Sequence, residues 1–422
     1  MVTGGRTEMI IRNREDTGKI NDDVLNSVLR EHSFDIERFD KLDRLYRGEH
    51  TILKRELANA APNNRVVCNY AKYISDMAVG YLLGKPISYR GENEEDITEM
   101  KRRFSAANMA NTDAEIAKDM SIFGKAEELI YMSDDEVPIA KSINIDPRNA
   151  FVVYDDTVEN RKIFGVYFYP KCDLEGRIKE YVINVYTKER HYKYLCNNIF
   201  DRKKILAEEN RIYFCDVPMI EYLNNEEEQG DFEQVISLID AYNILQSDRI
   251  NDVERFVQAI LFLKGFCIEE GDGKRLKEER ILQAPGDNTD AKWLANSLDQ
   301  NSLESVRKSI ERDIHKFSFV PAMTDENFSG NASGVAMKYK LLGFEQMTGI
   351  KERYMEKGIR ERLKIITNMI NWSNNLKYED IEIIFTHNLP VNKEEMADIL
   401  YKLSSVTDEK AIKESALTLI SH

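Results

Sequence analysis

One long stretch without a helix breaker limits what this chain can fold into. No proline occurs between Ala322 and Leu389, and within that span apolar residues recur every three or four positions from Leu342 to Ile370. This spacing predicts a single helix over residues 334–371 with one apolar side. At 1.5 Å per residue such a helix would be roughly 57 Å long, which is too long for the core of one small domain. We therefore expect it to cross between domains or to line an assembly.

A polar loop precedes this helix. Residues 317–333 are rich in Ser, Asn, Gly and acidic side chains and offer no apolar face to bury, so the tip, Thr324–Ser333, is expected to be exposed. Within the helix, Gly343, Gly349 and Gly358 each cost about 1 kcal/mol relative to alanine. We expect bends at these three positions.

Charge and composition exclude several classes of protein. The chain has 74 acidic and 59 basic residues and a net charge of −15, whereas tight binding of nucleic acid depends mainly on Lys and Arg at phosphates. DNA could still pass such a protein without sticking to it. The five cysteines are scattered without a C-x-x-C pair, which indicates free thiols in a reducing compartment. Because no signal peptide and no membrane-spanning apolar run is evident, we expect a soluble, cytosolic product without a membrane partner.

The first half of the chain is predicted to combine helices with strands. Residues 1 to about 20 are expected to form a loose arm. From Ala126 to Phe214 the apolar spacing changes to two, in β-branched and aromatic runs separated by charged turns. This pattern predicts an antiparallel β-meander beside helices, and hence an α+β fold. The helices expected before it cover Asp22–Glu31, Phe34–Arg47, Asn69–Leu83, a helix opening at Glu92–Asp96, and Asn111–Phe123, with a short strand at Ile87–Tyr89.

The second half is predicted to be mainly helical. Apolar residues over Asp231–Leu263 have helical spacing, and Asp231 stands where it could cap that helix. A small, highly charged insertion, Gly265–Asn301, separates it from the next helix, Ser302–His315. After the long helix the sequence predicts a strand at Ile381–Phe385, a turn at Asn388–Pro390, and helices at Lys393–Ser404 and Glu409–Ile420.

The chain shows no recognisable catalytic or metal-binding motif. Gly80–Lys85 is one residue short of a phosphate-binding loop, and Pro86 stands where Ser or Thr would have to bind magnesium. The histidines have neither H-E-x-x-H nor zinc-site spacing, and His315 is expected to be a packing or surface residue. The acidic pairs Asp134–Asp135 and Asp155–Asp156 are expected to be solvated turn residues. We therefore expect no enzyme activity, no cofactor and no metal.

Several stretches, taken together and in order, resemble the portal proteins of tailed double-stranded-DNA bacteriophages, in the branch of long-tailed phages of Gram-positive hosts. The more specific stretches are Gly80–Ile87 and Ser329–Ala336, and the resemblance covers about residues 35–395. The other matching stretches are Tyr46–His50 with Arg55, Asn64–Val67, Asn69–Lys72, Val217–Pro218, Asn224–Asn225, Phe232–Glu233, Leu238–Asn243, and Phe385 with Asn388–Pro390.

The resemblance implies a portal-like fold with named parts. These are an N-terminal arm and first helix (1–33), an α+β wing (34–230), a stem helix (231–264), a clip (265–301), a second stem helix (302–316), a tunnel loop (317–333), a long helix (334–372), a wing strand and turn (373–395), and the start of a short or truncated helical crown (396–422).

The resemblance also implies a function. Such a chain would form a homo-oligomeric ring, dodecameric in the particle, at one capsid vertex of the virion, after assembly in the host bacterial cytoplasm. The ring would be the channel for DNA packaging, retention and ejection. Its partners would be double-stranded DNA without sequence specificity, the terminase large subunit and then the head–tail connector or adaptor, and the scaffold and major capsid proteins.

Three groups of residues follow as candidate sites. The tunnel loop would contact DNA sterically, since it holds no Lys or Arg, through Met323, Thr324, Asp325, Glu326, Asn327, Phe328, Ser329, Gly330 and Asn331. The stem has two interpretations: its basic residues either make weak phosphate contacts or are ordinary solvated helix charges. These residues are Arg307, Lys308, Arg312 and Lys316. The clip would meet its partners through Lys274, Arg275, Lys277, Arg280 and Trp293.

An alternative is a structural adaptor or scaffold, monomeric or in a small oligomer, that uses its long helix to bind a partner. It differs from the portal interpretation in lacking a closed ring. Long helices with uncovered apolar stripes favour self-assembly, because that surface must be buried somewhere.

Overall fold

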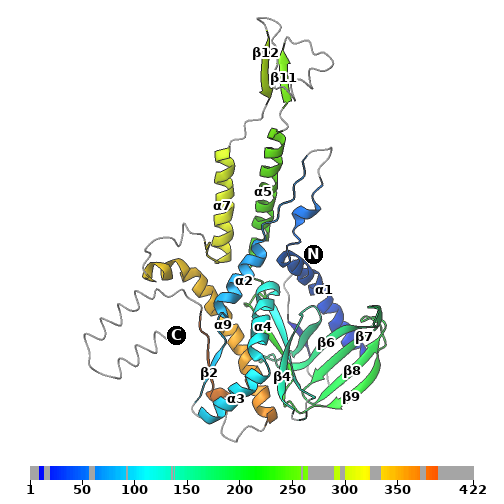
Figure 1. Ribbon diagram of the computed structural model, residues 1–422. Coiled ribbons are helices and arrows are strands. Elements are labelled where there is room, and N and C mark those ends of the chain that lie inside the picture. The colour runs from blue at the N-terminus through cyan, green and yellow to red at the C-terminus, as the bar shows by residue number, and fades with distance from the viewer. Residues whose placement is uncertain are drawn as a thin grey trace, which may run out of the picture. The chain divides into compact units, whose positions relative to one another are not determined.

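The computed structural model describes residues 9–13, 20–56, 62–91, 94–134, 136, 138–257, 260–264, 289–294, 300–323, 334–370 and 377–387. Helices and sheets are mixed in this part of the chain (Figure 1), in agreement with the predicted α+β class. Contacts divide the chain into two units. The first unit comprises residues 1–49, 69–236 and 315–422, and the second unit comprises residues 50–68 and 237–314.

A six-stranded sheet in the first unit contains the predicted meander. Consecutive strands pair antiparallel from β5 to β9, as expected from the period-two pattern. The N-terminal arm, predicted to be loose, instead contributes strand β1, which pairs parallel with β5 so that Ile10 lies opposite Val153. That prediction was wrong for this segment because Ile10, only 6% exposed, is buried in the core of the sheet. The strands are β1 (Ile10–Arg12), β5 (Ala150–Asp155), β6 (Lys162–Cys172), β7 (Ile178–Thr187), β8 (Arg190–Cys196) and β9 (Ile205–Arg211).

One helix, α1 (Asp22–Tyr46), packs on this sheet where the sequence predicted two helices divided at residues 32–33. Nothing in that stretch breaks a helix, and His32 is buried, with its ring stacked on Phe151 at 4.6 Å. The proposed boundary between residues 33 and 34 therefore falls inside an element. Burial lowers the pKa of His32 to about 3, so its imidazole is neutral and belongs to the core.

A second sheet has the order β10-β3-β4, with β3 at Lys125–Met132, β4 at Ala140–Ile145 and β10 at Met219–Leu223. All pairs in it are antiparallel. Its apolar side packs against β5 in a small core that includes Leu129, Val152 and Met219. The structure thus has two sheets where the sequence predicted a single meander. Strand β10 follows the strands of the larger sheet in sequence and pairs with β3 in the smaller sheet.

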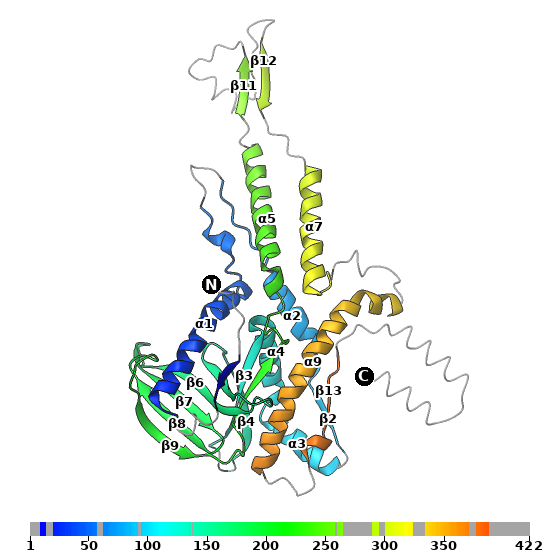
Figure 2. The ribbon, with the colours of Figure 1, turned by 180° about the vertical axis from the view of Figure 1, so that it is seen from behind.

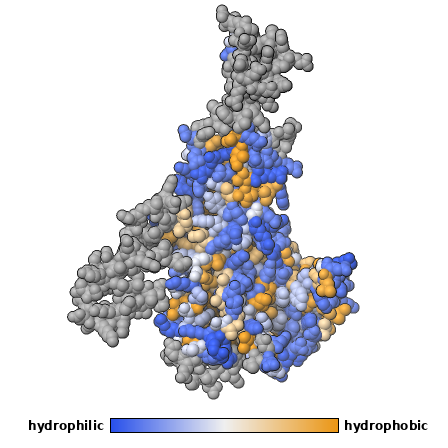
Figure 3. Space-filling model, viewed as in Figure 1, coloured by the Kyte–Doolittle hydropathy of each residue, from blue (hydrophilic) through white to orange (hydrophobic). Residues whose placement is uncertain are grey.

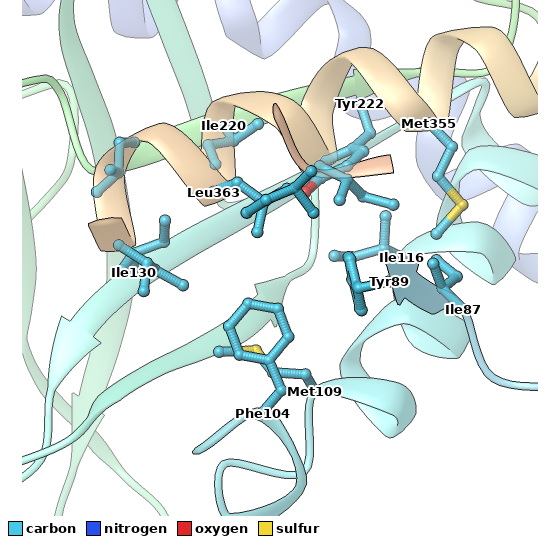
Figure 4. Packing of buried hydrophobic residues seen from close by; sticks show 14 of the residues in the cluster. Ile87, Tyr89, Phe104, Met109, Ile116, Ile130, Ile220, Tyr222, Met355 and Leu363 are labelled. Atoms are coloured by element: carbon cyan, nitrogen blue, oxygen red, sulfur yellow. The ribbon is translucent and has the colours of Figure 1, made fainter. Parts of the chain in front are cut away.

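Helices cover the other side of the small sheet (Figure 4). Tyr222 and Ile220 of β10 and Ile116 of α4 meet Met355 and Leu363 of α9 in the largest core cluster. A two-stranded sheet, β2 (Ser88–Arg90) with β13 (Glu382–Ile384), closes one side of this cluster, and a 3-10 turn at Tyr378–Asp380 precedes β13. The helices are α2 (Tyr70–Leu82), α3 (Glu94–Ala106), α4 (Met109–Phe123) and α9 (Gly334–Ile370).

The predicted long helix is present as α9, which changes direction between its N-terminal turns and the rest (Figures 1 and 2). Two of its glycines stand in different surroundings. A Cβ at Gly358 would lie 2.3 Å from the ring of Tyr222, whereas a Cβ at Gly349 would meet nothing within 4 Å. Gly358 therefore permits close packing on β10, a reason that the sequence pattern did not indicate.

Alanine substitutions at these two glycines are expected to have opposite effects. Gly358→Ala should lower the free energy of unfolding by about 1–3 kcal/mol, because the Tyr222 ring would have to move. Gly349→Ala should raise it by up to about 1 kcal/mol, because alanine favours the helix and meets no neighbour. Thermal unfolding of both variants checks this, and a lower melting temperature for Gly349→Ala would contradict the stated environment.

The second unit contains two helices lying side by side, α5 (Ile236–Val257) and α7 (Gln300–Ser318), the latter ending beyond the unit (Figures 1 and 2). The sequence predicted that the first would continue to Leu263. It ends at Val257, and β11 (Ile260–Lys264) pairs antiparallel with β12 (Asp290–Leu294). The run Ile-Leu-Phe-Leu favours a strand once a partner strand is present.

The sequence predicted that Asp231 would cap α5, and the structure shows that it does not. A 3-10 turn at Glu233–Val235 precedes the helix, and Asp231 is buried at 9% exposure. Its carboxylate accepts hydrogen bonds from Ser121 (2.5 Å) and Asn224 (3.0 Å) and pairs with Lys351. The side chain thus joins α4 and α9 to the segment that leads into α5.

Candidate functional site

Arg307 fastens α7 to α5 within the second unit. Its guanidinium donates to Glu304 at 2.6 and 2.9 Å, to Glu311 at 2.7 Å and to the Tyr242 hydroxyl at 3.1 Å. These partners raise the pKa of Arg307, and its side chain is 18% exposed. Its positive charge is therefore largely compensated by Glu304 and Glu311 within the helix pair.

The other predicted stem cations differ from Arg307. Lys308, Arg312 and Lys316 follow one another at four-residue spacing on α7, which places them along one side of the helix. All three are exposed. The Arg312 side chain is 75% exposed, donates to Ser309 at 3.3 Å and lies 3.8 Å from Asp313, and Lys316 lies 5.4 Å from the centre of the Phe317 ring.

A strap, residues 62–68, runs in extended form along α5 and is held by three side chains of that helix. The backbone N–H groups of Asn64, Val66 and Cys68 donate to Asn251 (2.7 Å), Ser247 (2.9 Å) and Asn243 (2.8 Å), in that order. Four helical residues rise about 6 Å and two extended residues about 6.6 Å, so the two series stay in register.

The sequence analysis did not predict this ladder, the three hydrogen bonds from the strap to Asn243, Ser247 and Asn251. Its signal is the N-x-x-x-S-x-x-x-N pattern of residues 243–251, where three short polar side chains interrupt the apolar spacing at i, i+4 and i+8. All three are at most 2% exposed. In the same unit, before the strap in sequence, Arg55 pairs with Asp248 at 2.5 Å and Thr51 donates to Asp240 at 2.8 Å, so acidic residues of α5 are engaged as well.

Several large apolar side chains remain exposed on this helix pair. They are Ile244 (46%), Ile250 (45%) and Val253 (60%) on α5 and Val306 (49%) on α7. Figure 3 shows hydrophobic surface in this part of the chain. Nine residues separate Ile244 from Val253, which places them on opposite sides of α5. Exposed apolar side chains of this kind are typical of surfaces that another protein covers.

The sequence belongs with proteins of known type. It matches the family described as "Phage portal protein, SPP1 Gp6-like" over residues 25–421. The chain belongs to this portal protein family. Relatives include the portal protein of Clostridium phage phiCD119, 22% identical over 400 residues that cover 89% of this chain and 86% of that protein. The portal protein of Bacillus phage SPP1 is 21% identical over 382 residues, which cover 84% of this chain and 74% of that protein.

The resemblance inferred from the sequence is thereby confirmed, including the branch of phages with Gram-positive hosts. The portal family is structural and non-enzymatic. Within the described part of this portal chain, no group of three or more His, Cys, Asp or Glu side chains could hold a metal ion. No helix there is both long and apolar enough to cross a membrane.

The structure describes only some of the residues assigned to portal sites. Met323 is described and is 49% exposed, whereas the rest of the predicted DNA-contacting loop, Thr324–Asn331, lies outside the described residues. The same holds for the predicted turn at Asn388–Pro390, for the predicted crown, residues 396–422, and for the clip residues Lys274, Arg275, Lys277 and Arg280. Trp293 lies on strand β12, and nothing is described of its side chain.

The two acidic pairs predicted to be solvated turn residues, Asp134–Asp135 and Asp155–Asp156, differ in their exposure. Asp134 is exposed, as expected, and its neighbour at position 135 lies outside the described residues. Asp156 is exposed as expected, whereas Asp155 is 1% exposed, so solvation was the wrong expectation for Asp155. Its carboxylate accepts hydrogen bonds from the backbone N–H groups of Thr157 (3.2 Å) and Arg161 (2.9 Å), and it organises the turn after β5.

The portal chain also buries an arginine that the sequence analysis treated as part of an ordinary helix. Arg362 of α9 is 0% exposed and donates to Asp113 of α4 at 2.5 Å. Its Nε lies 2.8 Å from Glu128 of β3, without the alignment of a hydrogen bond, and the Tyr222 hydroxyl donates to Glu128 at 2.6 Å. Burial would lower the pKa of Arg362, but the two carboxylates raise it well above its ordinary value, so the guanidinium is charged and ties α9 to α4 and the small sheet.

A cavity of about 820 Å³ lies between the end of β5, β6, β10 and α9 in the first unit. Lysines on its wall pair with neighbouring acids, Lys162 with Glu361 and Lys364 with Asp216. These pairs connect α9 to β6 and to the segment before β10. Five acidic and five basic side chains line the cavity, so the lining has no net formal charge that would indicate a ligand.

Proposed function

We propose that this chain forms the ring-shaped channel at one capsid vertex through which a phage packages, retains and ejects its DNA. The observation that carries the proposal is the family match over residues 25–421. Portal proteins generally form ring oligomers with capsid, terminase and DNA. In this proposal the ring contains twelve subunits in the particle and binds first the terminase large subunit and then the head–tail connector.

The exposed apolar side chains of the second unit support self-assembly. Ile244, Ile250, Val253 and Val306 are 45–60% exposed in the isolated subunit. A head-to-tail contact between copies joins two different surfaces of each copy, so it would cover apolar side chains on opposite sides of α5, and a contact of that kind closes into a ring when its rotation is a fraction of a full turn. The strap and the Arg307 contacts would keep each helix pair rigid within the ring.

The charges favour a channel that lets DNA pass. The chain is acidic overall, with a net charge of −15, so the protein as a whole repels phosphate. We assign weak, sequence-independent phosphate contacts to Lys308, Arg312 and Lys316, since Arg307 is engaged by Glu304 and Glu311. The loop at residues 323–331 would touch the duplex sterically, and the clip, residues 265–301, would meet the motor and the connector.

The alternative is a structural adaptor that is monomeric or forms a small oligomer. Light scattering after gel filtration, with negative-stain images of the same peak, separates the two proposals. The portal proposal predicts closed rings with a central hole. A small closed dimer without rings, at every salt and protein concentration tested, would contradict it and favour the adaptor.

A charge placed on the exposed side of α5 is expected to block the ring. Val253→Glu should leave the subunit folded, because this side chain is 60% exposed, but should shift the native mass to that of monomers or small oligomers. Val158→Glu is the matched control, since Val158 is fully exposed on the turn between β5 and β6. Rings of unchanged abundance in Val253→Glu would show that α5 does not form the contact between subunits.

A further inference from the structure

A tyrosine of α2 holds the chain between α7 and the loop that follows it. The Tyr73 hydroxyl donates to the carbonyl oxygen of Pro321 at 3.0 Å and accepts from the backbone N–H of Met323 at 3.3 Å. One side chain therefore engages two backbone groups on either side of Ala322. Both partners lie about 250 residues from Tyr73 in the sequence, within the first unit.

Aromatic neighbours fix the direction of that hydroxyl. The rings of Tyr73 and His315 meet edge to face, with centroids 5.8 Å apart, and Tyr70 meets His315 in the same way at 5.7 Å. His315 Nδ1 lies 2.9 Å from the carbonyl oxygen of Val320, so this nitrogen carries the proton and donates. The imidazole thus holds both the tyrosine pair and the backbone just before Pro321.

The backbone turn at this point is strained and nevertheless well surrounded. Phe319 has φ of 59°, a left-handed conformation that an aromatic residue seldom adopts. Its neighbours Ser318 and Val320 are 4% and 2% exposed, and Gln234 donates to the Phe317 carbonyl at 2.5 Å. Strain of this kind persists only where the surroundings determine the conformation.

The Phe319 ring also reaches the helix on the far side of the loop. A Cβ on Gly343 of α9 would lie 3.5 Å from that ring. The segment 319–323 is therefore in contact with α2, with the end of α7 and with α9, which begins after the loop. Its position is set by three elements, of which α2 lies about 250 residues away in the sequence.

We propose that Tyr73 is a positioning residue that fixes where the chain leaves α7 for the DNA-contacting loop. We call the two hydrogen bonds of the Tyr73 hydroxyl to Pro321 and Met323 the clamp. The role of the clamp in DNA packaging rests on the proposed function, whereas the existence of the clamp rests on these two contacts. In the channel, force exerted on residues after Met323 would pass through the Tyr73 hydroxyl into α2. Residues at the proposed DNA contact would then hold a constant starting position in every subunit.

The test compares two hydroxyl deletions on the same helix. Tyr73→Phe keeps the ring packing and removes both bonds. Tyr81→Phe is the control, because the Tyr81 hydroxyl donates to Glu345 of α9 at 3.2 Å, eight residues along α2. In the full-length protein, amide hydrogen exchange of residues 319–323 should become about three- to tenfold faster in Tyr73→Phe and stay unchanged in Tyr81→Phe. Unchanged exchange in Tyr73→Phe would overturn the clamp.

DNA packaging by particles that carry each variant tests the role of the clamp. Tyr73→Phe should form rings normally and package DNA less efficiently, while Tyr81→Phe should package as the parent does. Faster exchange together with normal packaging would overturn the positioning role. If the parent protein itself forms no rings, the proposed function fails, and the exchange comparison still decides whether the clamp exists.

Discussion

Replacing Arg362 by Met is expected to lower the free energy of unfolding by about 3–5 kcal/mol. The guanidinium is 0% exposed and lies between Asp113 and Glu128, which are also buried. Removing one partner from a buried ion pair leaves the other charges without compensation, and this loss exceeds the cost of the missing bonds. Chemical denaturation at neutral pH measures the change.

Lys364→Met is the matched control for Arg362→Met. Lys364 lies two residues further along α9 and pairs with Asp216 at 2.8 Å, but the two side chains are 42% and 32% exposed. A solvated pair of this kind contributes about 0–1 kcal/mol. Equal effects of the two substitutions would show that the Arg362 cluster is not the buried network described above.

The deficit of Arg362→Met should shrink as the pH falls. Burial already raises the pKa of Asp113, and Arg362 opposes that shift. Without the guanidinium, Asp113 should take up a proton more readily in the folded state than in the unfolded chain. A folded-state pKa above the unfolded value makes the variant relatively more stable at low pH, so its deficit is largest above neutral pH.

Periodic patterns predicted the elements whose side chains follow one rule along their length. The helix α9 and the strands from β5 to β9 were expected because apolar residues recur at a constant spacing over many positions. The pairing of β2 with β13 joins two short strands some 290 residues apart, and the sequence indicated each strand but gave no sign of their partnership. Local spacing predicts elements and leaves their long-range partners open.

The features that the sequence did not predict correctly have a common physical origin. Strand β1 is stable only because β5 offers an edge, and β11 forms because β12 lies beside it, so tertiary contacts decided against the local expectation. The buried charges were missed for a related reason. Arg362, Asp231 and the ladder at Asn243, Ser247 and Asn251 are polar residues that the periodic pattern assigns to solvent.

The carboxyl of Glu127 is expected to make the protein sensitive to alkaline pH. Glu127 and Glu221 are directly opposite each other on β3 and β10, at 0% and 5% side-chain exposure, which places two acids together away from water. Glu221 receives hydrogen bonds from Lys125 (3.2 Å) and Tyr154 (3.1 Å), whereas neither oxygen of Glu127 meets a donor within the described residues. Burial, and then the charge of Glu221, raises the pKa of Glu127 well above its ordinary value, despite the opposing charges of Lys125 and Lys162.

Glu127→Gln should therefore stabilise the protein above about neutral pH. The folded state keeps a proton on Glu127 that the unfolded chain releases above its own pKa, near 4.5, so stability falls as the pH rises towards the folded-state pKa. Each pH unit over which only the folded state holds this proton costs about 1.4 kcal/mol. Glutamine supplies the N–H donor to Glu221 without that proton, and the slope of stability against pH should flatten.

The neighbouring residue provides the control for Glu127→Gln. Glu128 lies next to Glu127 on β3, is equally buried, and accepts from Tyr222 beside Arg362. Glu128→Gln removes a charge that Arg362 needs, so it should destabilise the protein by about 3 kcal/mol at neutral pH. Unfolding curves between pH 5.5 and pH 8.5 should thus move in opposite directions for two identical substitutions one residue apart. A pH slope that Glu127→Gln leaves unchanged would mean that Glu127 is ionised in the folded protein and that Glu221 shares no proton with it.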